Sequence, residues 1–287
     1  METQATHEPS DGVVLGIAGV GLIGGSIAAA ARGVSSRIIG FGRSLERLRT
    51  AREAGLIDEF SVDYELCREV DLFISCLPVD RIAESVRTAS ALMPPGSIAT
   101  DAGSTKQSIC TAIGVAPSPM TTFIGSHPLA GSEKQGFEHA DAHLFERRVC
   151  VITPTGAEPP ETVGRLADFW ASLGSRVVSL SAVEHDRILA RTSHMPHIAA
   201  AAVAGGVEES DLPFASGGFR DTTRIAGGDP SLWAAILLAN EEAVGAALDA
   251  VIERCGRFRE AVRQGDAKLL RTLLTDAKMR RDAFDES

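Results

Sequence analysis

A short glycine-rich turn near the start of the chain constrains its fold more than any other feature. The β-rich run 13–18 leads into Gly19-Val20-Gly21-Leu22-Ile23-Gly24, and an alanine-rich helical segment follows. Glycine at the first position permits a tight turn, at the second it lets backbone approach a pyrophosphate, and at the third it lets helix and strand pack closely. The helix N-terminus then attracts phosphate through its free N–H groups and its dipole. The pattern predicts a dinucleotide site of the Rossmann type at Gly19, Gly21, Leu22, Ile23 and Gly24.

Strand-like and helix-like segments alternate over the rest of the N-terminal half. Apolar runs occupy 37–41, 71–77 and 97–100, and helix-like segments between them include 44–54 and 80–92. This alternation is typical of βαβ units and a parallel sheet. It favours a nucleotide site over the alternative, a glycine turn with a structural role alone. Later apolar runs are candidates to extend the same sheet, at 121–125, 149–153 and 176–180.

The strand pattern stops after about residue 182, and the remaining pattern is helical. Residues 183–204 predict a helix that Pro196 should kink, and a glycine-rich loop is expected over 216–228. Asp229-Pro230 has the form of an N-cap followed by proline at the first helical position. Apolar residues then recur at helical spacing to about residue 264, which exceeds the usual length of a globular helix. A helix of this kind commonly packs against a partner, so we expect a dimerisation surface.

The length of 287 residues suits two domains better than one core. We predict an α/β protein, with a dinucleotide-binding Rossmann domain over 11–181 and an all-α substrate-binding and dimerisation domain over 182–287. A formal net charge of -10 argues against a nucleic-acid partner, because phosphate binding needs a basic surface. The sequence shows no membrane span, no signal peptide and no CxxC pair among its cysteines. We therefore expect a cytoplasmic protein with reduced thiols.

The end of the second predicted strand indicates which dinucleotide binds. An acidic residue there would bind the ribose 2′-hydroxyl of NAD. Here the strand ends in Gly42-Arg43-Ser44 without a carboxylate, and a guanidinium beside a hydroxyl suits a 2′-phosphate. We therefore predict NADP or NAD as cofactor, with NADP favoured; the alternative is that Arg43 is a solvated surface residue. Arg43, Ser44 and Pro78 complete the predicted cofactor residues.

Polar residues gather in four further segments of the chain. These are Asp101-Ala102-Gly103-Ser104-Thr105-Lys106, Gly125-Ser126-His127-Pro128-Leu129-Ala130-Gly131-Ser132-Glu133-Lys134, Ser193-His194-Met195-Pro196-His197 and Gly217-Gly218-Phe219-Arg220-Asp221-Thr222-Thr223-Arg224. In this order and spacing, and together with the glycine turn, they resemble the prephenate/arogenate dehydrogenase family over about residues 13–284. The resemblance implies oxidative decarboxylation of prephenate to 4-hydroxyphenylpyruvate in tyrosine biosynthesis. The alternative is an arogenate dehydrogenase, or a dual-specificity cyclohexadienyl dehydrogenase, that produces tyrosine directly.

The resemblance also implies which residues carry the chemistry. His127 matches the histidine that hydrogen-bonds the ring C4 hydroxyl, and Ser104 matches the serine that supports this histidine near the nicotinamide. Hydride leaves ring C4 while a base of near-neutral pKa takes the hydroxyl proton, and histidine suits that task. The carbonyl formed in this way is the electron sink for loss of the C1 carboxylate, so we expect no metal.

Further matches lie around the implied substrate pocket. Arg224 matches the arginine that binds a substrate carboxylate, with Asp221 in its ionic network. His197 matches a histidine that faces the substrate side chain, and this donor favours prephenate over arogenate. Trp233 matches an aromatic that approaches the pocket from the other subunit of a homodimer. The remaining predicted lining residues are Ser132, Glu133 and Gly217.

Two other classes of protein share the glycine turn. A dehydrogenase of the 3-hydroxyacid or 6-phosphogluconate type would place a catalytic lysine in the helical domain, but no lysine lies between Lys134 and Lys268. A nucleotide-sensing protein would keep the glycines without the polar segments at His127 and Arg224. Both alternatives fit the sequence less well than the prephenate/arogenate dehydrogenase family.

Overall fold

The computed structural model describes residues 12–131 and 134–285. Contacts within the chain divide it into two compact units, Met1–Asn240 and Glu241–Ser287. This division differs from the boundary predicted after residue 181, which stays a prediction.

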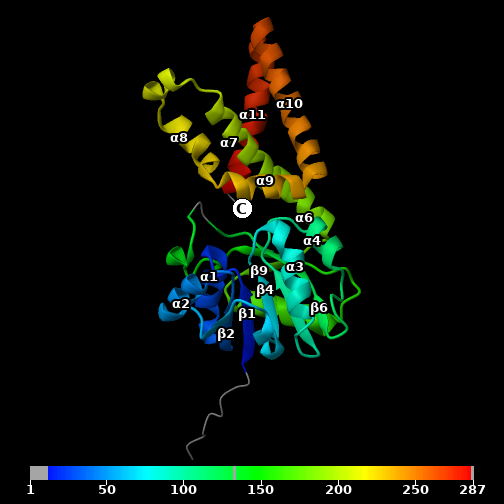
Figure 1. The fold of residues 1–287 in the computed structure, drawn as a ribbon. Coiled ribbons are helices and arrows are strands. Elements are labelled where there is room, and N and C mark those ends of the chain that lie inside the picture. Colours follow the sequence, from blue (N-terminus) through cyan, green and yellow to red (C-terminus); the bar gives the residue numbers. More distant parts are fainter. Residues whose placement is uncertain (1–11, 132–133, 286–287) are drawn as a thin grey trace, which may run out of the picture. The chain divides into compact units, whose positions relative to one another are not determined.

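A six-stranded parallel sheet forms the centre of Met1–Asn240, in the order β3-β2-β1-β4-β5-β6 (Figure 1). Its strands are β1 (Val13–Ala18), β2 (Ser35–Phe41), β3 (Glu59–Ser61), β4 (Leu72–Ser75), β5 (Ser97–Asp101) and β6 (Thr121–Phe123). The helices between them are α1 (Leu22–Ala30), α2 (Leu45–Glu53), α3 (Val79–Ser90) and α4 (Gln107–Ile113). The Rossmann-type sheet predicted from the alternation is therefore confirmed. Strand β3 was not expected, because Glu59-Phe60-Ser61 is not an apolar run.

Alternate residues of the central strands pack against opposite faces of this sheet. Leu15 and Ile17 of β1 belong to a buried cluster that includes residues of α1, α2 and α5 (Pro160–Ser172), among them Trp170. Ala18 and Phe73 belong to a second cluster with residues of α3 and α4. Strands buried on both faces are apolar along their whole length, which explains the continuous apolar runs of the sequence.

The last three strands form a separate sheet. Strand β7 (Gly125–Pro128) pairs antiparallel with β8 (Val149–Thr153), and β8 pairs parallel with β9 (Arg176–Ser179). The expectation that the runs at 149–153 and 176–180 extend the first sheet was therefore wrong. The reason is that the chain leaves the first sheet after β6 and β7 bonds to β8 instead. This change of sheet places His127 on β7.

Helical segments follow β9 in Met1–Asn240. Helix α6 (Ala182–Leu189) begins at a capping box formed by Ser181 and Glu184. A π-helical turn over Ala190–His194 leads into α7 (Met195–Gly205), with Pro196 in its first turn. Proline cannot donate the backbone hydrogen bond of a helix interior, and the wider turn accommodates it.

The glycine-rich stretch expected to be a loop is largely helical. It contains α8 (Gly217–Thr223) and a 3-10 turn over Arg224–Gly227. Glycine stands at the start of α8 and at the end of the 3-10 turn, where the backbone enters and leaves helical conformation. The expectation of an irregular loop over 216–228 was therefore wrong.

The single long helix expected after Asp229 is two helices. Asp229 caps α9 (Pro230–Ala239) by accepting the N–H of Leu232 at 2.8 Å, as the sequence predicted. Asn240 then leaves the helical backbone with φ −126° and ψ 37°, and α10 (Glu241–Gln264) begins. The side-chain amide of Asn240 donates to the carbonyl of Asp186 and to Nδ1 of His194. Apolar spacing continues across the break, so periodicity alone could not reveal it.

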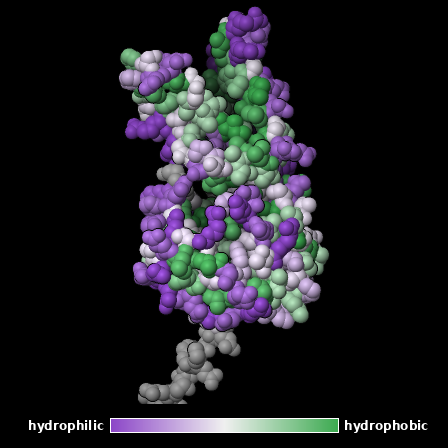
Figure 2. All heavy atoms as spheres, viewed as in Figure 1, coloured by the Kyte–Doolittle hydropathy of each residue, from purple (hydrophilic) through white to green (hydrophobic). Residues whose placement is uncertain are grey.

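Residues Glu241–Ser287 contain α10 and α11 (Ala267–Asp285). The two helices contact each other, and Gly265 between them has a φ of +68°. Hydrophobic residues lie on the surface of this helical hairpin in Figure 2. The exposed large ones are Ile252, Val262, Leu274, Met279 and Phe284. Within the described residues, no helix is both long and apolar enough to cross a membrane.

Candidate active site

The glycine turn forms one end of an open groove at the carboxyl ends of β1 and β2. Gly19 has a φ of +87°, a conformation that favours glycine, and its N–H donates to the carbonyl of Phe41 at 2.9 Å. A side chain at Gly24 would collide with the carbonyl oxygen of Gly19, whereas a Cβ at Gly21 would meet no atom within 4 Å. Gly24 therefore permits α1 to pack closely, and the space at Gly21 is open to a ligand. This geometry fits a pyrophosphate at the N-terminus of α1.

Most of the predicted cofactor residues line this same groove. They are Gly19, Gly21, Arg43, Ser44 and Pro78. Arg43 is exposed, and Ser44 caps α2 by accepting the N–H of Arg47 at 3.3 Å. Arg47 and Arg81 also line the groove, so three guanidinium groups lie along it. Leu22, Ile23 and Gly24 lie in the first turn of α1 but are not among the lining residues.

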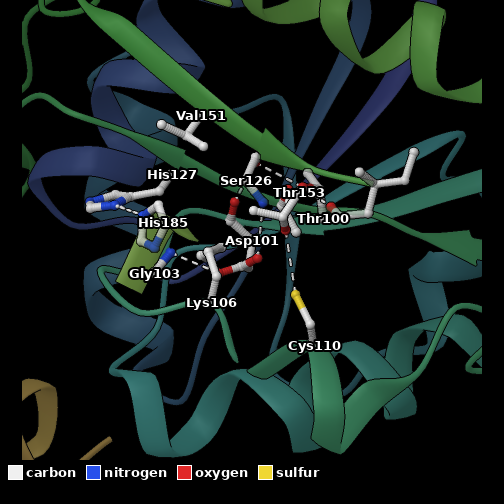
Figure 3. A network of polar contacts seen from close by, with 12 residues as sticks. Thr100, Asp101, Gly103, Lys106, Cys110, Ser126, His127, Val151, Thr153 and His185 are labelled. Carbon is white, nitrogen blue, oxygen red and sulfur yellow. Dashed lines mark hydrogen bonds and ion pairs between the residues drawn. The ribbon is translucent and has the colours of Figure 1, made fainter. Parts of the chain in front are cut away.

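His127 belongs to a cluster of polar side chains that Figure 3 shows from close by. Its Nδ1 lies 2.8 Å from Nε2 of His185, and Nδ1 of His185 lies 2.7 Å from Oδ1 of Asp186. His185 and Asp186 are buried, whereas His127 is half-buried. Removal from water, with smaller effects of His185, Lys106 and His194, lowers the pKa of His127 well below its ordinary value. His127 is therefore neutral near pH 7, as a general base must be.

A buried ion pair between Lys106 and Asp101 lies next to the two histidines (Figure 3). Both side chains are fully buried, and Lys106 Nζ donates to Asp101. Asp101 also accepts the N–H groups of Gly103 at 2.9 Å and Ser126 at 3.2 Å. Burial raises the pKa of Asp101, and the charge of Lys106 opposes that shift. These bonds connect the end of β5 to β7 and so hold the backbone next to His127.

His197 and Trp233 stack on each other, with ring centroids 3.6 Å apart and ring planes inclined by 12°. Nδ1 of His197 is buried and has no hydrogen-bond partner in the described part of the chain. A buried polar atom of this kind is suited to bind a ligand. Trp233 was expected to approach the pocket of the other subunit. In this structure it packs on His197 of its own chain, because the Asp229 cap places it in the first turn of α9.

The other predicted substrate residues are less closely grouped. Asp221 and Arg224 are exposed, at the end of α8 and in the turn that follows. No ion pair joins Asp221 to Arg224 among the described side chains, and Gly217 is the first residue of α8. Ser104 is half-buried, and within the described ranges no hydrogen bond joins it to His127, whose Nδ1 contacts His185 instead. The predicted Ser132 and Glu133 lie outside the described residues.

Both halves of the chain match domains of one known protein family. Residues 27–179 match the nucleotide-binding domain of prephenate dehydrogenase, and residues 181–276 match its dimerization domain. The chain belongs to the prephenate dehydrogenase family. It is therefore an oxidoreductase with a nicotinamide cofactor, and the family resemblance of its motifs is confirmed.

Individual relatives agree with this assignment over most of the chain. A cyclohexadienyl dehydrogenase of Zymomonas mobilis is 32% identical, across 89% of this chain and 90% of that protein. A prephenate dehydrogenase of Bacillus subtilis is 35% identical, across 93% of this chain and 75% of that protein. The crystal structure of prephenate dehydrogenase from Aquifex aeolicus with hydroxyphenyl propionate and NAD+ has a TM-score of 0.85 at 28% identity, covering 95% of this chain and 98% of that chain.

Three residues of the polar cluster in this family member were not predicted from the sequence: His185, Asp186 and Asn240. One signal for the first two was available, because an adjacent histidine and aspartate follow the capping box of α6. Nothing in the local pattern shows that His185 meets His127, which lies 58 positions earlier in the chain. Asn240 lies inside an apolar helical pattern, where the sequence gives no sign of a break.

Proposed function

We propose that this member of the prephenate dehydrogenase family converts prephenate to 4-hydroxyphenylpyruvate by NAD(P)-dependent oxidative decarboxylation. The observation that carries this proposal is the environment of His127. Its Nδ1 is hydrogen-bonded to His185, and Nε2 has no hydrogen-bond partner in the described part of the chain. A neutral imidazole with one engaged and one available nitrogen is suited to take a proton from a substrate hydroxyl.

Each part of the reaction has a candidate residue on this chain. When bound, the nicotinamide cofactor supplies the acceptor for the hydride that leaves ring C4 of the substrate. His127 takes the proton of the C4 hydroxyl, and Ser104 is proposed to lie beside this hydroxyl. Electrons then flow from the breaking C1–carboxylate bond into the new carbonyl, which makes the ring aromatic and releases CO2.

The remaining proposed residues hold the substrate. Arg224 binds a substrate carboxylate with Asp221 near it, since an arginine can form paired hydrogen bonds to a carboxylate. His197 offers Nδ1, which has no hydrogen-bond partner among the described residues, to the side chain of the substrate. Other proposed lining residues are Ser132, Glu133, Gly217 and Trp233.

We infer a preference for NADP from the end of β2. Arg43 and Arg47 both line the groove there, and Ser44 lies between them in sequence. No carboxylate directly follows Phe41, where an acidic residue would bind the ribose 2′-hydroxyl of NAD and repel a 2′-phosphate. The relative from Aquifex aeolicus was crystallised with NAD+, so NAD remains the alternative cofactor.

We also propose that the chain acts as a homodimer through its helical half, residues 182–287. The match to the dimerization domain of the family and the exposed hydrophobic residues of α10 and α11 support this proposal. Large exposed apolar surfaces mark protein contacts. Light scattering should report a mass of two chains, and a fully active monomer would contradict the proposal.

Arogenate is the second candidate substrate, and the similarity of this chain to the cyclohexadienyl dehydrogenase of Zymomonas mobilis supports it. Initial rates with prephenate and with arogenate, each with NAD and with NADP, decide between the candidates. We expect the highest kcat/KM with prephenate and NADP. A chain that turns over neither substrate would contradict the proposed function.

A further inference from the structure

A continuous line of hydrogen bonds runs from Asp186 through His185 to His127. The two distances are 2.7 Å from Asp186 Oδ1 to His185 Nδ1 and 2.8 Å from His185 Nε2 to His127 Nδ1. His127 comes from β7, and His185 and Asp186 come from α6. His185 and Asp186 are both buried. A histidine nitrogen either donates or accepts, so the direction of each bond depends on its neighbour.

The direction is set at Asp186, because backbone N–H groups can only donate. Oδ1 of Asp186 accepts the N–H of Lys106 at 2.7 Å, and Oδ2 accepts the N–H of Gln107 at 2.9 Å. Both carboxylate oxygens therefore act as acceptors. Nδ1 of His185 must then donate to Oδ1, and the remaining nitrogen of neutral His185 has a lone pair.

This lone pair fixes the tautomer of His127. Nε2 of His185 can only accept, so Nδ1 of His127 must carry the proton and donate it. Nε2 of His127 then has the lone pair, on the nitrogen that the described side chains leave without a partner. An aspartate or a second histidine that holds a base in the required tautomer is a recognised means of preparing it for proton transfer.

We propose that His185 and Asp186 are positioning residues that hold His127 in the Nδ1–H tautomer and stabilise the imidazolium formed during catalysis. The inference rests on the proposed function, in which Nε2 of His127 takes the proton of the substrate hydroxyl. One O–H bond breaks and one N–H bond forms at Nε2, and the proton returns to the same oxygen once loss of CO2 has made it a phenolate. The proton on Nδ1 stays in place throughout.

Among the charged groups near His185, Asp186 is the one that can stabilise the imidazolium. Lys106 is paired with Asp101, so its charge is already compensated. His194 accepts from Asn240 through Nδ1, and burial lowers the pKa of His194 to about 4, so it is neutral. Asn240 also donates to the carbonyl of Asp186 at 2.9 Å and thereby fixes the position of this residue. The carboxylate of Asp186 therefore compensates the positive charge that develops on the histidine pair.

Two substitutions of His185 separate tautomer control from simple packing. Glutamine can present an oxygen that accepts from His127 Nδ1, whereas leucine cannot. We expect H185L to lower kcat by about 100-fold and H185Q by about 10-fold, with KM for prephenate changed by less than about three-fold. The control is H143Q, because His143 forms a 2.6 Å pair with Glu146 on the surface and should be dispensable.

Interruption of the hydrogen-bond line gives a readout that does not depend on activity. In D186L no oxygen accepts the proton of His185 Nδ1, so the line no longer fixes the tautomer of His127. Two-dimensional 1H–15N NMR of histidine-labelled protein distinguishes the tautomers, with H127Q and H185Q to assign the signals. We expect the Nδ1–H form of His127 in the wild type and a mixture of the Nδ1–H and Nε2–H forms in D186L.

Several results would overturn the proposal. They are an Nε2–H tautomer of His127 in the wild type, an unchanged tautomer in a folded D186L, or equal kcat values for H185Q, H185L and the wild type. Circular dichroism and cofactor affinity show whether each variant is folded. A wild type that does not turn over prephenate would instead contradict the proposed function, and the NMR result would still decide the positioning role.

Discussion

The cofactor groove and the His127 cluster use opposite means to build a site. The part of the groove that fits a pyrophosphate is backbone, from the glycine turn that begins at Gly19, and side chains such as Arg43 and Arg47 line the rest. The cluster is made of side chains that β5, β7, α6 and the end of α9 bring together. A backbone site needs residues that are small, and its pattern is local. A side-chain cluster needs compensating charges, and its members can lie anywhere in the chain.

The largest effect should follow removal of the proposed base. H127N should lower kcat by about 100-fold to 10,000-fold while the affinity for the cofactor stays unchanged, because His127 is not a lining residue of the groove. Steady-state kinetics and cofactor titration measure the two effects. The matched change in the groove is G21V, which should weaken cofactor binding and leave the fold intact, since no atom lies near a Cβ there. Near-normal turnover by H127N would remove His127 from the mechanism.

Loss of the buried ion pair should reduce stability. K106M leaves the carboxylate of Asp101 buried without a counter-charge, and we expect a loss of about 3–5 kcal/mol in the free energy of unfolding. Urea denaturation measures it. The control is R32M, which breaks the Arg32–Asp58 pair at the surface, where a change below about 1 kcal/mol is expected. Equal losses in both variants would show that burial does not distinguish the cluster from the surface.

A smaller effect is expected when Arg43 of the groove is replaced. Arg43→Ala should remove about 1.5–3 kcal/mol of NADP binding, or one to two decades of affinity, and leave NAD binding intact. Raised salt should weaken NADP binding more than NAD binding, because an exposed charge pair is screened. Arg49→Ala is the control, since Arg49 is exposed on α2 but does not line the groove. A wild type with higher kcat/KM for NAD would contradict the cofactor preference.

The smallest effect for a single step of the experiment, about 1 kcal/mol for each pH unit, is the acid sensitivity of the cluster. Burial lowers the pKa of His194 from 6.5 to about 4, so the unfolded chain binds its proton at higher pH than the folded chain. The contribution of neutral His194 to the free energy of unfolding is therefore fully present above pH 6.5. It falls as the pH drops towards 4, by about 1 kcal/mol per pH unit. Denaturation curves over this range measure the slope, which H194Q should reduce. H143Q should not, since Glu146 raises the pKa of His143 at the surface. An unchanged slope in H194Q would contradict this account.

The comparison also explains what could be predicted from the sequence. The glycine turn, the parallel sheet and the Asp229 cap were predicted correctly, because each depends on sterics or hydrogen bonds within a few residues. The four polar segments and the glycine turn, in their order along the chain, indicated the family correctly, since the residues of each segment are adjacent in the chain. By itself the sequence thus determined the fold class and the family.

Tertiary structure alone decided which side chains meet. It paired His127 with His185, ended α9 at Asn240, and stacked Trp233 on His197. The bond from Lys106 to Asp186 joins residues 80 positions apart, and no local preference encodes such a distance. The direction of the hydrogen bonds from His127 to Asp186, and with it the tautomer of His127, depends on the packed chain, because a buried donor bonds to whichever acceptor the fold places beside it.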